Sequence, residues 1–263
     1  AGRNHIVNEA ELLALELPGA KTQGLYLELK RYLRHHRAPK AVFLFIDPDD
    51  LKSAMYVILK YFVSVPEFME LWPDLTWEER LNFISRYWVS FDQRVVGLDV
   101  KAVYPFSNAQ FVSELIANRG YMPSPGSAEP LEDGYFKRTG ARVNKSIFIS
   151  PRDVIYLDKI IKLCDKNKIK IVMLGQLLPK ELHDILESTG FNRDYLVFME
   201  AVHEKYPELI FAVPSILYLD NQYFGDPSHV NAEGADLYTR YFKERVFLPL
   251  KNELESERKN EGL

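Results

Sequence analysis

The sequence predicts an α/β fold: a single domain of residues 1–263 in which helices cover both faces of a parallel sheet, giving three layers. Segments that are apolar along their whole length recur in the chain, which is typical of strands buried on both faces. Amphipathic segments lie between them, as the alternation of strand and helix in a parallel sheet requires. Residues 51–145 break this alternation and are predicted to form a helical insertion, rich in aromatic residues.

Four segments are predicted to be strands. Residues 12–19 (LLALELPG) end in Pro-Gly, 41–48 (AVFLFIDP) in Asp-Pro and 169–175 (IKIVMLG) in Gly, whereas 208–220 contain Pro214. A proline cannot donate a ladder hydrogen bond, so we expect the fourth strand to be broken there. The glycines and prolines that close the other runs mark the turns into the following segments.

Three helices are predicted between these strands. Residues 22–36 have apolar residues at helical spacing and a basic last turn, which suits the negative end of a helix dipole. Residues 150–168 begin with Ser150 as a cap, followed by a proline at the first helical position. Residues 192–206 are also amphipathic and precede the last strand. A helix that leads directly into a strand is the repeating unit of an open parallel sheet.

Composition narrows the classes of function. The chain is 47% hydrophobic, which is ample for a packed core, and it contains no uninterrupted apolar run long enough to cross a membrane. A formal net charge of −4 argues against a nucleic-acid partner. The single cysteine, Cys164, excludes an internal disulfide framework, and no pair of histidines has zinc-ligand spacing, so we expect no metal site.

The sequence opens with Ala1 rather than with methionine. We interpret this as a protein from which a signal or anchor segment has been removed. The expected location is therefore extracytoplasmic, in the periplasm or at the cell surface, with membrane anchoring through the removed segment as an open alternative.

The segment 224–242 (FGDPSHVNAEGADLYTRYF) carries the clearest chemical signal. Asp226 stands three residues before His229, with a strand upstream and a helical pattern downstream. At this spacing the carboxylate can bind the imidazole Nδ1, which leaves Nε2 to take a proton from a hydroxyl nucleophile. Asn231 is expected to hold the loop. The competing interpretation is a surface turn, because Asp-Pro-Ser is ordinary turn sequence.

The string DPSHVNAEG (226–234) resembles the last sequence block of the SGNH (GDSL-like) hydrolase superfamily. LELPGAK (15–21) resembles the second-strand region of that superfamily, and KNKIKIVMLGQLLP (166–179) its fourth-strand segment. The resemblance covers residues 10–50 and 150–245. It is strongest to the acyl-transfer branch, which includes the D-alanylation protein of teichoic acid synthesis and the alginate O-acetylation proteins. It implies a flavodoxin-like, three-layer α/β/α SGNH-like domain.

The resemblance also implies a Ser-His-Asp mechanism. His229 would be the general base and then the general acid, Asp226 would orient it, and Gly19 would donate its backbone N–H to the oxyanion. The implied activity is that of an O-acyltransferase or esterase, acting on an acylated small molecule, a cell-envelope glycan or a related acylated polymer. A membrane-bound acyl-transfer partner would fit this activity, and no metal or organic cofactor is implied.

Two features depart from the family pattern. The family nucleophile is a serine after the first strand, but this chain has no serine before Ser53. Either that strand and its serine lie upstream of Ala1, or the block has degenerated and residues 2–4 are its remnant. A missing central strand would expose two unpaired edges, which favours the upstream serine. The family's oxyanion asparagine is also missing, because residues 45–51 read FIDPDDL.

Two other functions stay open. A catalytically inactive SGNH-type envelope protein would keep the scaffold for binding. Alternatively, Asp47 and Asp49 after a hydrophobic strand would suit a magnesium-dependent, haloacid-dehalogenase-type phosphatase, with Asp47 as nucleophile and Asp49 as acid/base. The threonine that this chemistry expects two residues after Asp49 is Leu51. Capping of the next helix is a simpler role for the two aspartates.

Overall fold

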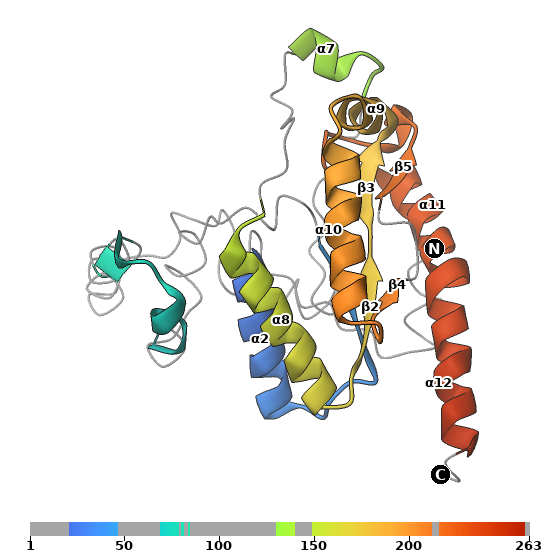
Figure 1. The fold of residues 1–263 in the computed structure, drawn as a ribbon. Helices are drawn as coiled ribbons and strands as arrows, with labels where there is room; N and C mark the ends of the chain where they lie inside the picture. The colour runs from blue at the N-terminus through green and yellow to red at the C-terminus, as the bar shows by residue number, and fades with distance from the viewer. Residues whose placement is uncertain are drawn as a thin grey trace, which may run out of the picture.

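A computed structural model describes residues 21–46, 69–78, 80–81, 84, 130–139, 149–211 and 216–260. This part of the chain is mixed α/β, with parallel strands in two small sheets and a larger share of helix (Figure 1). The strand predicted at 12–19 and most of the insertion predicted at 51–145 lie outside the described residues.

Parallel pairing links segments that are far apart in the chain. Strands β1 (Ala41–Phe45), β2 (Lys170–Leu174) and β4 (Ile210–Phe211) form one sheet in the order β1-β2-β4. Strands β3 (Gln176–Pro179) and β5 (Ile216–Leu219) form a second parallel pair. Only Gly175 separates β2 from β3, and the two strands run end to end in Figure 1. One long stretch of chain therefore contributes to both sheets.

The register changes between the two sheets. Val172 pairs with Ile210, whereas Gln176 pairs with Ile216. The two pairing positions are therefore four positions apart on the first stretch of chain and six positions apart on the second. The ladder thus shifts by two residues along its length.

The predictions for this region need two corrections. Strand β2 ends at Leu174, next to the predicted Gly175 end, but the separate strand β3 that follows at Gln176–Pro179 is absent from the predicted strands. Helix α9 (Lys180–Ser188) is absent from the predicted helices, and Pro179 is its N-cap. The predicted break in the last strand agrees with the separate strands β4 and β5, although Pro214 itself lies outside the described residues.

Three helices cover one face of β1 and β2. They are α2 (Lys21–His35), α8 (Pro151–Lys166) and α10 (Phe191–Lys205), and each lies within two residues of its predicted bounds. Because side chains alternate along a strand, Ile171 and Met173 point to the same face and join the buried cluster formed with these helices. The Tyr195 hydroxyl donates to the Ile46 carbonyl at 2.6 Å, which ties α10 to the end of β1.

The C-terminal helices contact the opposite face. Helix α11 (Ala232–Phe242), the π-helical turn η5 (Lys243–Phe247) and α12 (Leu248–Asn260) follow one another without a break (Figure 1). Val172 and Leu174, the alternate residues of β2, pack against Val246 and Leu250. Helices therefore lie against both faces of the strands. None of the helices in the described ranges is long and apolar enough to cross a membrane.

Short pieces of the predicted insertion are described and are helical. The 3-10 helix η2 (Trp72–Asp74) is held by Asp74, which accepts hydrogen bonds from the Tyr156 hydroxyl at 2.7 Å and from Lys159. Glu70 likewise accepts from the Tyr26 hydroxyl at 3.0 Å. Burial, with help from this hydrogen bond, raises the pKa of Tyr26 to about 12, so the phenol remains a donor. Residues 70–74 are thus attached to α2 and α8 through part-buried polar contacts.

Candidate functional site

The carboxyl ends of parallel strands are the usual place for functional residues in an open α/β sheet. Strand β5 ends at Leu219, and residues 220–231 then form a loop that leads into α11. We call this segment the β5–α11 loop; it begins with the 3-10 turn η4 (Asn221–Tyr223). It carries both residues of the predicted Asp-His pair.

The hydrogen bond expected from the Asp-x-x-His spacing is present. His229 Nδ1 lies 2.8 Å from Asp226 Oδ2 and 3.0 Å from Oδ1. The backbone N–H groups of Ser228 and His229 also donate to Oδ1, at 2.8 and 2.9 Å. Since a carboxylate only accepts, Nδ1 carries a proton and neutral imidazole keeps its lone pair on Nε2. No described residue forms a hydrogen bond with Nε2.

The pair is exposed to solvent. The exposed fraction of the side chain is 56% for His229 and 41% for Asp226. Partial burial would raise the pKa of the Asp226 carboxyl, but hydrogen bonds from Ser228 and His229 outweigh it and hold that pKa below its ordinary value. Asp226 is therefore ionised at neutral pH and can stabilise a protonated imidazole.

Backbone contacts close the loop around this pair. Phe224 and Val230 form an isolated antiparallel bridge, and Gly225 N–H donates to the His229 carbonyl at 2.9 Å. The side-chain amide of Asn231 adds a further hydrogen bond across the loop, donating to the Gln222 carbonyl at 2.7 Å. Asn231 therefore holds the loop, as the sequence predicts.

The start of α11 is also fixed by local contacts. Asn231 is the N-cap of α11, and its Oδ1 accepts from Gly234 N–H at 3.0 Å. A Cβ atom at Gly234 would lie 2.1 Å from the Tyr223 carbonyl oxygen. Only glycine allows the helix to approach the strand-end turn this closely.

Ser228 is close to the pair but on the wrong side of the ring for a nucleophile. Its Oγ lies 3.0 Å from Asp226 Oδ1 and 3.3 Å from His229 Nδ1. A nucleophile must instead reach Nε2, the nitrogen that can accept its proton. Ser228 therefore supports the carboxylate, and no hydroxyl among the described residues forms a hydrogen bond with Nε2.

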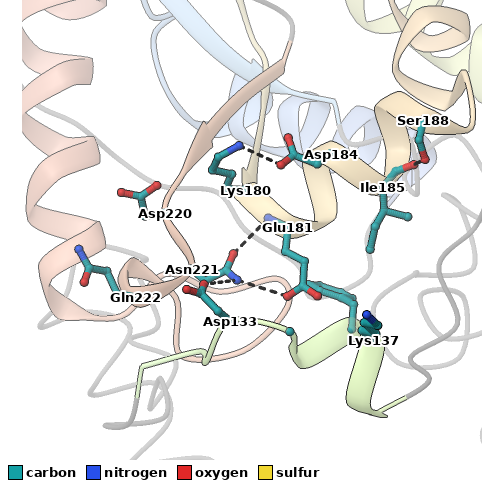
Figure 2. A pocket seen from close by; sticks show the side chains of 12 residues that line it. Asp133, Lys137, Lys180, Glu181, Asp184, Ile185, Ser188, Asp220, Asn221 and Gln222 are labelled. Carbon is teal, nitrogen blue, oxygen red and sulfur yellow. Dashed lines mark hydrogen bonds and ion pairs between the residues drawn. The ribbon is translucent and has the colours of Figure 1, made fainter.

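A pocket of about 980 Å³ opens at the beginning of the same loop (Figure 2). Its lining comes from the segment around α7 (Tyr135–Thr139), from α9 and from the residues that follow β5. The lining residues are Asp133, Gly134, Phe136, Lys137, Lys180, Glu181, Asp184, Ile185, Ser188, Asp220, Asn221 and Gln222. This pocket is absent from the sequence-based predictions, although the polar run directly after a predicted strand (DNQ, 220–222) is a signal that could have indicated part of it.

Asn221 connects the three parts of the pocket wall. It is buried, with an exposed fraction of 4%. Its Nδ2 donates to Asp133 at 3.0 Å and to Glu181 Oε2 at 3.3 Å, and its Oδ1 accepts from the Glu181 backbone N–H at 3.2 Å (Figure 2). The Leu131 N–H also donates to the Phe224 carbonyl at 2.7 Å. These bonds fix the segment around α7 to α9 and to the β5–α11 loop.

The other predicted site residues lie outside the described part of the chain. These are Gly19, the predicted oxyanion donor, and Asp47 and Asp49, the aspartates of the phosphatase alternative. The structure therefore brings together Asp226, His229 and Asn231 and leaves the rest as predictions. Among the described residues, no group of three or more His, Cys, Asp or Glu side chains is arranged to hold a metal ion.

No protein-family profile, curated protein or solved structure matches this chain. The fold and the loop thus define the class by themselves: an α/β protein with parallel strands and an exposed Asp-His pair after the carboxyl end of a strand.

Proposed function

We propose that this protein is an SGNH-type O-acyltransferase or esterase, a three-layer α/β/α domain that acts outside the cytoplasm on a cell-envelope glycan or a related acylated polymer. The observation that carries the proposal is the 2.8 Å contact between Asp226 Oδ2 and His229 Nδ1, with Nε2 left open. A fold alone does not support a function. A histidine oriented by a carboxylate, after the carboxyl end of a parallel strand, is the general base of a site that activates a hydroxyl.

The strand order gives independent support to the proposed fold. The observed order β1-β2-β4 corresponds to the third, fourth and fifth strands of the flavodoxin-like order 2-1-3-4-5. In that arrangement the first strand would pair with the edge of β1 that has no partner among the described residues, and the second strand would pair with the first. The segment 12–19 is the proposed second strand.

The proposed reaction has two acyl-transfer steps. The lone pair of His229 Nε2 takes the proton of a serine hydroxyl as that oxygen attacks the acyl carbonyl, and Asp226 stabilises the resulting imidazolium. The imidazolium then gives its proton to the departing alcohol, leaving an acyl-serine. Water or an acceptor hydroxyl reverses these steps and releases the acyl product. The serine is the family nucleophile that the resemblance implies before the strand at residues 12–19, and Gly19 N–H would bind the oxyanion.

The first test measures ester hydrolysis by the full-length natural protein. With p-nitrophenyl acetate, His229→Ala should lower kcat/KM about 10²–10⁴-fold, the range typical for loss of a general base. Ser228→Ala is the matched control, because Ser228 contacts the pair only on its Asp226 and Nδ1 side and should change the rate only a few-fold. Activity that survives His229→Ala would contradict the proposed role of the histidine.

A second test identifies the nucleophile. A fluorophosphonate probe reacts with a serine that a neighbouring base activates, and mass spectrometry of the labelled full-length protein locates that serine. We expect the label on a serine that precedes residues 12–19 and a much slower reaction in His229→Ala. A protein that neither reacts with the probe nor hydrolyses esters would favour the inactive-scaffold alternative. Magnesium-dependent phosphate release that Asp47→Asn abolishes would favour the phosphatase alternative instead.

A further inference from the structure

We propose that the pocket beside the β5–α11 loop binds an uncharged, hydroxyl-rich ligand, a neutral oligosaccharide, and discriminates against anionic polymers. The claim about binding is independent of the reaction. Only the statement that this oligosaccharide is the acyl acceptor rests on the proposed function.

The pocket lining carries more acidic than basic side chains. The pocket presents four carboxylates, from Asp133, Glu181, Asp184 and Asp220, and two ammonium groups, from Lys137 and Lys180. Its formal net charge at neutral pH is therefore −2. Like charges placed opposite one another are costly at a binding surface, so a phosphate- or carboxylate-bearing ligand is disfavoured.

Part of the lining is already held in place. Asn221 binds Asp133 and Glu181, and Lys180 binds Asp184 at 2.8 Å (Figure 2). The hydrogen bond from Lys180 lowers the pKa of Asp184, so this carboxylate stays charged at neutral pH. These contacts restrain five of the twelve lining residues before a ligand arrives, which reduces the entropy lost on binding.

The remaining polar side chains are available to a ligand. Lys137, Asp220 and Gln222 line the pocket, and none of them has a side-chain hydrogen bond or ion pair within the described ranges. They provide a donor, an acceptor and an amide that does both. Sugar hydroxyl groups also donate and accept, so they can satisfy all three side chains and the free lone pairs of the bound carboxylates.

The size of the pocket and its position next to the Asp-His pair also fit an oligosaccharide. The volume of about 980 Å³ is at the upper end of the roughly 300–1,000 Å³ typical of small-molecule pockets, so it suits a chain of several sugar rings better than one ring. Gln222 lines the pocket, and its carbonyl accepts the hydrogen bond from Asn231 that holds the loop of Asp226 and His229. The pocket and the Asp-His pair thus share one structural unit.

Binding is tested on full-length His229→Ala, which lacks the proposed base and should not consume a ligand. The probes are cellotetraose, maltotetraose, mannotetraose and chitotetraose, with tetragalacturonate as the anionic tetrasaccharide, measured by calorimetry and saturation-transfer NMR. We expect at least one neutral tetrasaccharide to bind and tetragalacturonate to bind at least tenfold more weakly. Failure of all four neutral probes, or equal binding of tetragalacturonate, would overturn the proposal.

Point variants then locate the site. Asp220→Ala and Gln222→Ala should each weaken binding of the neutral tetrasaccharide, Asp220→Ala by about tenfold, the effect of losing one hydrogen bond to a charged group. Asp165→Ala is the matched control, since Asp165 is exposed at the end of α8 that precedes β2, the opposite end of the strands. Asp220→Lys should narrow the preference against tetragalacturonate. Neutral-sugar binding that neither pocket variant weakens would place the site elsewhere and overturn the assignment.

The two proposals fail in different ways. Sugar binding together with absent ester hydrolysis and absent fluorophosphonate labelling would leave the pocket as a carbohydrate site and reject the catalytic function. Ester hydrolysis that depends on His229, without binding of any neutral tetrasaccharide, would keep the catalytic function and reject the pocket assignment.

Discussion

The two ends of the long parallel strand pair differ in what surrounds them. Around β2 and β4, Val172 and Met173 are buried, and helices lie against both faces. Around β3 and β5, Tyr218 is exposed and the chain continues into the polar residues Asp220 and Asn221. The same two stretches of chain thus contribute to the large buried cluster at one end and to smaller buried clusters beside the polar pocket at the other.

We therefore expect stability to depend mainly on the β2–β4 end and function mainly on the β3–β5 end. The larger apolar cluster lies at the β2–β4 end, so we expect it to contribute more packing free energy, which scales with the apolar area removed from water. The polar residues at the β3–β5 end contribute little by burial, with Asn221 as the exception. Substitutions at the two ends should therefore change different quantities: mainly the free energy of unfolding at the β2–β4 end, and mainly activity or ligand binding at the β3–β5 end.

The largest effect is expected in the core. Ile160 is 1% exposed in the cluster beneath β2, and Ile160→Ala should lower the free energy of unfolding by about 2–5 kcal/mol. Ile155, on the same helix α8, is 47% exposed, and Ile155→Ala should change it by less than about 0.5 kcal/mol. Urea unfolding of both variants checks the comparison. Similar losses for the two would show that the described core does not hold the sheet.

A smaller loss is expected where α11 meets the β5–α11 loop. Gly234→Ala puts a methyl group against the Tyr223 carbonyl, so the helix must shift and the free energy of unfolding should fall by about 1–3 kcal/mol. The shift also moves the loop of Asp226 and His229, so ester hydrolysis should fall with it. Glu233→Ala, one residue earlier and exposed, is the control and should leave both measurements nearly unchanged.

Substitution of Asn221 tests whether the β3–β5 end is stabilised by its own hydrogen bonds. Asn221→Ala leaves its partners at Asp133 and Glu181 without their bonds, so we expect a loss of about 1–2 kcal/mol. Hydrogen exchange should rise mainly at residues 131–138, because the same bonds hold that segment against α9. A uniform rise across β1 and β2 instead would mean that the two ends do not behave separately.

The smallest effect concerns acid stability. The folded-state pKa of Asp226 lies below its unfolded value, so the pair stabilises the fold fully above the ordinary pKa of 3.8 and loses that contribution as the pH falls through the lowered folded pKa. Because the side chain is partly exposed, the contribution should stay below about 1 kcal/mol. The stability difference between wild type and Asp226→Asn, followed from pH 6 to pH 2, should therefore shrink towards acid. A difference that grows towards acid would contradict the sign.

Much of the β2–β4 end could be predicted from the sequence. Helices predicted at 22–36, 150–168 and 192–206 lie at Lys21–His35, Pro151–Lys166 and Phe191–Lys205, because continuous apolar strands and amphipathic helices leave a periodic pattern. Even there one detail differs: Ser150 is at the N-cap, but its side chain makes no capping hydrogen bond and is buried instead.

The β3–β5 end is harder to predict from the sequence, for physical reasons. Strand β3 is short and ends in Pro179, so it lacks the length and the alternation that identify a strand. The contacts of Asn221 join residues that are 40 and 88 positions away, which no local pattern encodes. The Asp226–His229 contact could be predicted because it joins residues only three positions apart, within one turn of chain.

The two-residue shift in register between the sheets has a consequence for how the chain tolerates insertions and deletions. Side chains alternate between the faces of a strand, so an even shift leaves every residue of β5 on the face it would have had without the shift. Gain or loss of one residue within β5 would reverse that alternation for the residues that follow it and put apolar side chains on the other face. Gain or loss of two residues would preserve the alternation.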